Sequence, residues 1–152
     1  MILLKPYKNI NETMYYLYLQ IKDSLKFADT FLPGHIQTPA ALFTLLKNNI
    51  VFVNDGPNEI LQSMQTLMDE SKNVWHVAGA GDCDCFVITA TACLIVCNIK
   101  TKIVLAGRDR RAPVHIYNLV KDGDTWAPFD LTNNFYKEVR SYQYIQTLPQ
   151  IN

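Results

Sequence analysis

Two cysteines separated by one residue, Cys83 and Cys85, stand in the stretch GDCDCFVIT, immediately before the longest uncharged segment of the chain. If a helix starts at Gly81 or Asp82, Cys83 lies in its first turn, where free backbone N–H groups and the helix dipole favour an anion. This position predicts a stabilised thiolate, which is the reactive form of a cysteine. Cys85 lies about 200° further round the helix axis, so we expect only Cys83 to react.

A nucleophilic cysteine needs a base within hydrogen-bond reach, and the chain offers three histidines. His35 follows a Pro-Gly turn and has no obvious partner, and His76 lies in the loop that precedes Cys83. His115 lies in the middle of APVHIYNLV, which reads as a strand, and Asp130 lies in the next predicted strand, DTWAPFDLT. We therefore take His115 as the candidate base and Asp130 as its candidate partner.

The turn between these two strands sets how His115 and Asp130 face each other. Asp122-Gly123 is a strong hairpin signal. With this tip, His115 is directly opposite Asp130, and their Cβ atoms are about 4.5–5.5 Å apart. A loop from Lys121 to Asp124 keeps this pairing and moves Pro128 away from a position that needs a backbone N–H.

Cysteine, histidine and aspartate in this order suit nucleophilic acyl transfer. The thiolate attacks a carbonyl, the imidazolium protonates the leaving group, and the carboxylate orients the imidazole. Taken alone, His115 also fits a hydrogen-bonded core histidine, and Asp130 fits a turn residue that bonds the backbone of DLTNN. The predicted pairing of the two favours the functional interpretation.

The elements that must position these residues form an α+β pattern, with helices first and antiparallel strands last. Helical spacing of apolar residues predicts amphipathic helices in the N-terminal half, and the segment after Gly81 is apolar nearly all round, as in a central helix. The predicted helices span 11–32, 38–49, 57–72 and 83–98, and the predicted strands span 100–107, 112–120 and 124–132.

Length and composition narrow the class of protein. The 152 residues suit a single domain, 1–152, and a net charge of zero argues against a nucleic-acid-binding protein. The apolar run Met1–Leu4 is too short for a signal peptide, and the uncharged stretch 85–99 falls short of the roughly 18–20 residues of a membrane span. We expect no membrane partner, no cofactor, reduced thiols and a cytoplasmic location.

The motifs GDCDC, HIY and WAPFD, in this order, resemble the transglutaminase-like superfamily of cysteine enzymes, in its bacterial and phage branch. The resemblance covers about residues 79–132. It implies a papain-like core, in which a central helix and N-terminal helices pack on an antiparallel sheet. It also implies that Cys83 is the nucleophile, His115 the base and Asp130 the orienting acid. Cys85 replaces the second acid of the family pattern GDCDD, which is not one of the three catalytic residues.

The resemblance further implies an oxyanion site formed partly by the backbone N–H of the nucleophile. Trp75, through its indole N–H, and Gln37 are candidates for the second donor, although no matching motif places either residue. Trp75 also fits a plain core aromatic. The substrate implied is a peptide or protein, and the enzyme implied is a peptidase, amidase or transglutaminase.

Two other functions fit the same residues. Because this branch is frequent in phage genomes, the chain is alternatively a virion-associated or assembly module that contacts phage structural proteins and has little or no turnover. A zinc site built from Cys83, Cys85, Cys93 and Cys97 is the third hypothesis, but the spacing C-x-C-x7-C-x3-C differs from that of ordinary zinc sites. Arg108, Arg110 and Arg111 fit a solvated loop or a contact to an anionic ligand.

Overall fold

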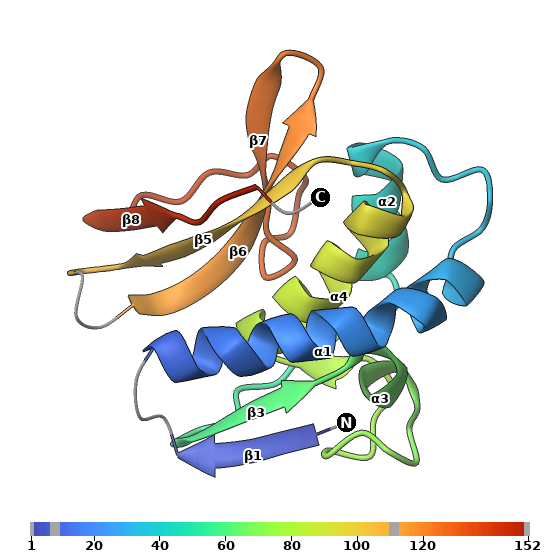
Figure 1. Cartoon of the computed structure of the whole chain (residues 1–152), viewed down its shortest axis with the longest axis vertical. Helices are drawn as coiled ribbons and strands as arrows, with labels where there is room; N and C mark the ends of the chain where they lie inside the picture. Colours follow the sequence, from blue (N-terminus) through green and yellow to red (C-terminus); the bar gives the residue numbers. More distant parts are fainter. Residues whose placement is uncertain (1, 7–9, 110–112, 151–152) are drawn as a thin grey trace.

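The computed structural model describes residues 2–6, 10–109 and 113–150. It contains both helices and strands up to the central helix, and only strands after it (Figure 1). The elements are, in chain order, β1 (Ile2–Pro6), α1 (Ile10–Phe31), α2 (Pro39–Lys47), β2 (Val51–Phe52), β3 (Asn58–Gln62), α3 (Met64–Met68), β4 (Ala80–Gly81), α4 (Cys83–Val96), β5 (Thr101–Gly107), β6 (Pro113–Asp122), β7 (Thr125–Phe129) and β8 (Tyr144–Thr147). This composition confirms the predicted α+β class.

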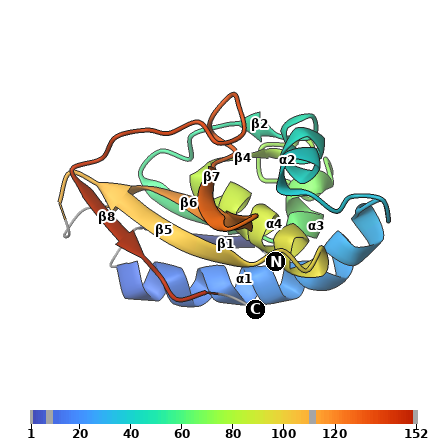
Figure 2. The ribbon, with the colours of Figure 1, turned by 90° about the horizontal axis from the view of Figure 1, so that it is seen from above.

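Helix α4 runs through the middle of the molecule, with the sheet of β5 to β8 on one side and α1 on the other (Figures 1 and 2). It is buried without a break from Cys85 to Leu94. Its Val87 and Ile88 pack with Leu17 of α1 and Ile103 of β5 in one core cluster. Because its apolar residues surround the axis, the helix has little stability of its own in water and depends on this burial.

The N-terminal helices form largely as predicted. Apolar residues of α1 at helical spacing, including Leu17 and Ile21, are buried. Helix α2 begins as the sequence indicates, because Thr38 caps it by accepting a hydrogen bond from the Ala41 N–H at 3.2 Å and Pro39 occupies its first turn.

The helix predicted over 57–72 is wrong in its first half. Asn58–Gln62 is strand β3, which pairs antiparallel with β1, and only Met64–Met68 is helical. Leu61 and Gln62 are buried next to each other, a pattern of a strand covered on both faces. The pairing partner lies at the start of the chain, so local periodicity could not reveal it.

The main sheet has the strand order β7-β6-β5-β8, and all its pairings are antiparallel. Strands β5, β6 and β7 confirm the three predicted strands, whereas β8 had no counterpart in the prediction. The short parallel pair β2–β4 was also not predicted; it brings the chain after α2 alongside the residues that precede α4.

The predicted hairpin register is wrong by two residues. Asp122 pairs with Thr125, so Gly123, with a φ of 59°, and Asp124 form the loop. A left-handed residue at this point suits the two-residue hairpin turns that match strand twist. Pro128 pairs with Leu119, and a loop from Lys121 to Asp124 does not form. A shift by two residues keeps every side chain on its predicted face.

Within the described residues, no helix combines the length and the apolar character that crossing a bilayer requires.

Candidate active site

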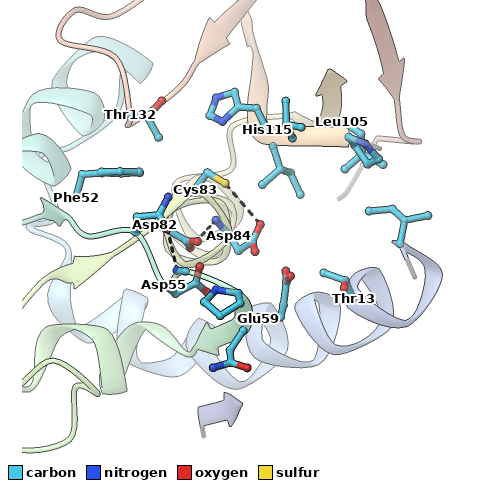
Figure 3. A pocket seen from close by; sticks show the side chains of 18 of the residues that line it. Thr13, Phe52, Asp55, Glu59, Asp82, Cys83, Asp84, Leu105, His115 and Thr132 are labelled. Carbon is cyan, nitrogen blue, oxygen red and sulfur yellow. Dashed lines mark hydrogen bonds between the residues drawn. The ribbon is translucent and has the colours of Figure 1, made fainter. Parts of the chain in front are cut away.

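Cys83 is the first residue of α4, and its side chain lies on the side of the helix that faces His115 (Figure 3). Asp82 is the N-cap, and its Oδ1 accepts a hydrogen bond from the Asp84 N–H at 3.2 Å. The chain enters this cap through β4, where the Val53 N–H donates to the Gly81 carbonyl at 2.8 Å. The predicted helix start, and the place of Cys83 in its first turn, are confirmed.

Two glycines let the chain reach the start of α4. Gly79 has a φ of 80°, and a Cβ there would lie 2.0 Å from the Asn49 carbonyl oxygen. A Cβ on Gly81 would lie 2.7 Å from the Cβ of Cys85. Both positions therefore require glycine for close packing, and they fix where the helix and its first residue sit.

His115 and Asp130 are hydrogen-bonded to each other, with 2.6 Å between Nε2 of the imidazole and Oδ2 of the carboxylate. The other carboxylate oxygen of Asp130 accepts from the N–H and the hydroxyl of Thr132, at 3.0 and 2.7 Å. Burial raises the pKa of Asp130, but the hydrogen bond and charge of His115, together with Thr132, outweigh burial and lower it below the ordinary value. Asp130 is therefore an anion that holds one edge of the imidazole and leaves Nδ1 for other contacts.

Two tyrosine rings accompany the imidazole. Tyr117, two residues along β6, stacks on His115 with ring centroids 5.7 Å apart. Tyr142, from the segment before β8, stacks on it at 5.8 Å with an interplanar angle of 24°. A charged hydrogen bond is stronger where water is excluded, so rings beside His115 help to preserve its bond to Asp130.

Cys83 and His115 both line a cavity of about 370 Å³. Figure 3 looks at this cavity near the start of α4, with His115 and Thr132 on one side of Cys83 and Asp55 and Glu59 on the other. The volume is within the range of small-ligand sites, about 300–1,000 Å³. The structure thus brings Cys83 and His115 to one cavity, and Asp130, which is not part of the cavity lining, contacts His115.

The surroundings of Cys83 favour its thiol over the thiolate. Among the described contacts its hydrogen bond goes to Oδ1 of Asp84, 3.8 Å from the sulfur, and not to His115. Burial, followed by the charges of Asp84 and Asp82, raises its pKa well above the ordinary value, while the Ile116 N–H acts in the opposite direction. The predicted thiolate is therefore not favoured in this state, because desolvation and two acids outweigh the helix dipole.

Acids line the cavity on the side away from His115. Burial, then the charge and hydrogen bond of Asp55, raise the pKa of Asp82 to about 8. Burial, then a hydrogen bond to Glu59, raise the pKa of Asp84 well above its usual range. Asp82 is thus paired with Asp55 and Asp84 with Glu59, and in each pair the residue of α4, or of its N-cap, has the raised pKa.

The other cysteines lie away from the cavity. Cys85 is completely buried, and its thiol donates to the Ile60 carbonyl of β3 at 3.2 Å. Cys93 is also completely buried and contacts the Met64 sulfur at 3.6 Å. Across the described residues no group of histidine, cysteine or acidic side chains is arranged to hold a metal ion, so the cysteines do not form the zinc site of the third hypothesis.

Neither candidate for the second oxyanion donor lines the cavity. Gln37 is exposed between α1 and α2, and the backbone N–H of Trp75 donates to Asn73 Oδ1 at 2.9 Å. His35 and His76 are exposed and also lie outside the cavity lining. Arg110 and Arg111 lie outside the described residues.

Sequence reasoning missed the wall built by the connection from β2 to β3. Asn54, Asp55 and Glu59 line the cavity there. Asn54 Oδ1 accepts a hydrogen bond from the Gly56 N–H at 2.8 Å, which folds the connection back on itself. The signal was the turn-rich stretch NDGPN, but only the parallel pairing of β2 with β4 brings this turn to Cys83.

No protein-family model matches this chain, and no curated protein resembles it significantly in sequence.

Proposed function

We propose that this chain is a cysteine-dependent enzyme of acyl transfer or amide hydrolysis, with a peptide or protein as its substrate. Cys83 is the nucleophile, His115 the general base and Asp130 the residue that orients the base. The observation that carries this proposal is the 2.6 Å hydrogen bond between His115 and Asp130, directly beside the cavity that Cys83 lines. An oriented base next to an accessible nucleophile is the arrangement that thiol acyl transfer needs.

The arrangement of elements supports a papain-like core of the transglutaminase-like type. A buried helix carries the candidate nucleophile in its first turn, and an antiparallel sheet beside it carries the candidate base and acid. The resemblance of the motifs GDCDC, HIY and WAPFD gave the same expectation. The proposal of this fold rests on these two observations together.

The proton route follows from the hydrogen bonds. Asp130 occupies Nε2 of His115, so Nδ1 is the nitrogen that accepts the thiol proton as the sulfur attacks the acyl carbon. The imidazolium then protonates the leaving amine, and the C–N bond breaks to give a thioester on Cys83. Water completes hydrolysis, or a second amine completes transfer, by attacking the thioester and restoring the thiol.

The raised pKa of Cys83 determines when this proton moves. Because burial disfavours the anion, the resting enzyme holds a neutral thiol rather than a thiolate–imidazolium pair. The thiol must leave Asp84 and transfer its proton to His115 as the substrate is attacked. Substrate binding that displaces the Cys83–Asp84 hydrogen bond would therefore activate the nucleophile.

The backbone N–H of Cys83 is the first oxyanion donor in this proposal. Asp82 receives the N–H groups of Asp84 and Cys85 at the helix start. The N–H of Cys83 is one of the helix-terminal donors without an acceptor within the helix. Asn54, which lines the same cavity, is a better placed candidate for the second donor than Trp75 or Gln37.

The Cys83–Asp84 hydrogen bond also favours a second candidate function. If no ligand displaces it, the chain is a virion-associated or assembly module of a phage that keeps the fold with little or no turnover. Acylation of the thiol separates the two functions, because a binding module has no need of a reactive Cys83.

The test is acylation by p-nitrophenyl acetate, a small activated ester. The proposal predicts a burst of p-nitrophenolate and one acetyl group that peptide mass mapping assigns to Cys83. The Cys83→Ala variant should lose the burst, whereas Cys97→Ala, which changes a half-buried cysteine outside the cavity, should retain it. A wild-type chain that shows no burst, or acetyl groups spread over several cysteines, would favour the assembly module.

A further inference from the structure

The chain between β7 and β8, residues 131–143, forms a loop whose two ends lie at the His115–Asp130 pair. Near its start Thr132 donates to the Asp130 carboxylate, and near its end Tyr142 stacks on His115. Figure 2 shows this red-brown segment turn back on itself in a narrow loop and then cross to the start of β8. Compact loops with neighbouring ends often have a functional role, and this one supports both members of the candidate pair.

The middle of the loop is attached to the β6–β7 hairpin, away from the site. The Tyr136 hydroxyl donates to Oδ2 of Asp122 at 2.9 Å, and Nζ of Lys137 lies 2.8 Å from the same oxygen. The Tyr136 ring also packs against Phe43 and Phe129, with ring centroids 5.7 and 6.0 Å apart. The middle of the loop is therefore fixed independently of the two ends.

Asn133 and Glu138 close the loop on itself. Asn133 is only 3% exposed, and its Nδ2 donates to the Glu138 carbonyl at 3.0 Å. Oε2 of Glu138 accepts the N–H groups of Asn134 and Phe135, at 3.1 and 3.4 Å. The N–H of Asn133 donates to the Asp130 carbonyl at 3.0 Å. These bonds connect the turn at Asp130 to the residue from which the chain returns to the site.

The returning part of the loop, residues 139–143, has little other support. Apart from Tyr142 its residues are exposed, and within the described stretch 113–150 its backbone makes no hydrogen bond to another element. Tyr142 stacks on Tyr117 at 6.3 Å and is hydrogen-bonded to Arg140 of the same segment. The place of the Tyr142 ring is therefore set largely by where the chain leaves Glu138 and where β8 begins.

We propose that Asn133 and Glu138 are positioning residues for the reaction at Cys83, because their contact holds the His115–Asp130 pair in place. This inference rests on the proposed function and adds two residues that act through others. Neither Asn133 nor Glu138 lines the cavity, so neither touches the substrate.

The contact acts on the pair along two routes. Through residues 139–143 it places the Tyr142 ring on His115, and through the Asn133 N–H it holds the turn that carries Asp130. If the contact is broken, both supports loosen while the tip of the loop stays attached to the hairpin. A displacement of about 1 Å in a reacting group can slow a reaction by about 10²-fold, so a small shift of the imidazole is enough to be measured.

The test compares Glu138→Ala with Glu138→Gln, which keeps an oxygen for the two N–H groups. The rate of acetylation of Cys83 by p-nitrophenyl acetate should fall by about ten- to hundredfold in Glu138→Ala, whereas Glu138→Gln should retain most of it. A second readout does not need turnover. The proton NMR signal of the His115 Nε2–H that bonds Asp130, assigned by 15N-histidine labelling, should broaden in Glu138→Ala and stay sharp in Glu138→Gln.

The control is Asn134→Ala, which changes an exposed side chain of the same loop but keeps the N–H that Glu138 accepts. It should match the wild type in both readouts. If Glu138→Ala does not fold, Asn133→Ala, which removes the Nδ2 donor, takes its place in the comparison. All variants are compared below their melting temperatures.

The outcomes separate this inference from the proposed function. A wild-type rate and a sharp signal without the contact, or a Glu138→Gln chain no better than Glu138→Ala, would overturn the positioning role. Acetylation of Cys83 would still stand in that case. A signal that broadens as expected in a protein whose wild type is not acetylated would instead overturn the proposed function.

Discussion

Asp130 accepts a hydrogen bond from His115 across 2.6 Å, although the two residues are not partners in the β6–β7 register. Asp130 follows directly after the last residue of β7, and pairing of the strands ends at Asn118 with Phe129. The contact is therefore diagonal. It forms because both side chains lie on the same face of the sheet, and Thr132 fixes the carboxylate from the other side.

Asp130→Asn tests the role of this contact. Asparagine can keep the shape of the site, but it removes the charge that stabilises the imidazolium and permits the wrong tautomer of His115. We expect the acetylation rate of Cys83 to fall by about 10²–10⁴-fold, with little change in thermal stability. Asp124→Asn in the hairpin loop is the matched control and should acetylate at the wild-type rate.

Tyr142 stacks on His115 from a segment distant in sequence, so its ring is expected to position the imidazole. Tyr142→Phe keeps the ring and should retain the acetylation rate and its pH profile. Tyr142→Ala removes a stack worth about 0.5–1.5 kcal/mol, and we expect a two- to tenfold slower rate, with a shift in the pH profile that a purely structural change would not produce. Equal rates in the two variants would show that the ring has no positioning role.

Cys85→Asp would give the motif the form GDCDD of the superfamily that it resembles, and it should destabilise this chain. The Cys85 thiol is buried and donates to the Ile60 carbonyl, which a carboxylate cannot do. We expect a loss of at least about 3 kcal/mol in the free energy of unfolding measured with urea, or protonation of the new acid. Cys85→Ala should lose only about 1 kcal/mol. A stable, ionised Cys85→Asp chain would contradict this account of the substitution.

The stability of the folded chain should depend on pH through the ionisation of Asp82. Its pKa is about 8 in the folded chain, because of burial and Asp55, and lies near 3.8 when exposed. The folded state thus binds the proton more tightly, so this contribution is complete below about pH 4 and is lost as pH rises toward 8. Asp130, whose pKa is lowered, stabilises the folded state at neutral pH, and this contribution is lost only as the pH falls through the acid range.

Scanning calorimetry from pH 5 to 8 measures this effect. The melting temperature of the wild-type chain should fall over that range, and Asp82→Asn, which keeps an N-cap side chain, should flatten the fall. An identical slope in the two proteins would assign the pH dependence to other groups.

The sequence predicted the elements whose signals are local. The N-cap at Thr38, the helix that starts with Cys83 and the strands that carry His115 and Asp130 all follow from residue spacing and turn chemistry. The His115–Asp130 contact was also anticipated, because a register error of two residues leaves side chains on the same face.

What the sequence could not predict depends on residues far apart in the chain. The pairing of β1 with β3 turned half of an expected helix into a strand, and the pairing of β2 with β4 brought Asp55 to Cys83. Burial of the first turn of α4 between these elements raises the pKa of the Cys83 thiol. Its position at the start of the helix had predicted a stabilised thiolate. Desolvation of this kind has no signature in residue spacing.

The central claim, that His115 makes Cys83 a nucleophile, is tested most directly by timed alkylation with iodoacetamide, followed by peptide mass mapping of all four cysteines. Because His115 accepts the thiol proton as the sulfur attacks, Cys83 should be alkylated faster than the completely buried Cys85 and Cys93, although its resting thiol is not ionised, with a rate that falls as pH is lowered. In His115→Ala this advantage should disappear while labelling of Cys97 is unchanged. Equal or absent labelling of Cys83 in the wild type, or an unchanged rate in His115→Ala, would contradict the account.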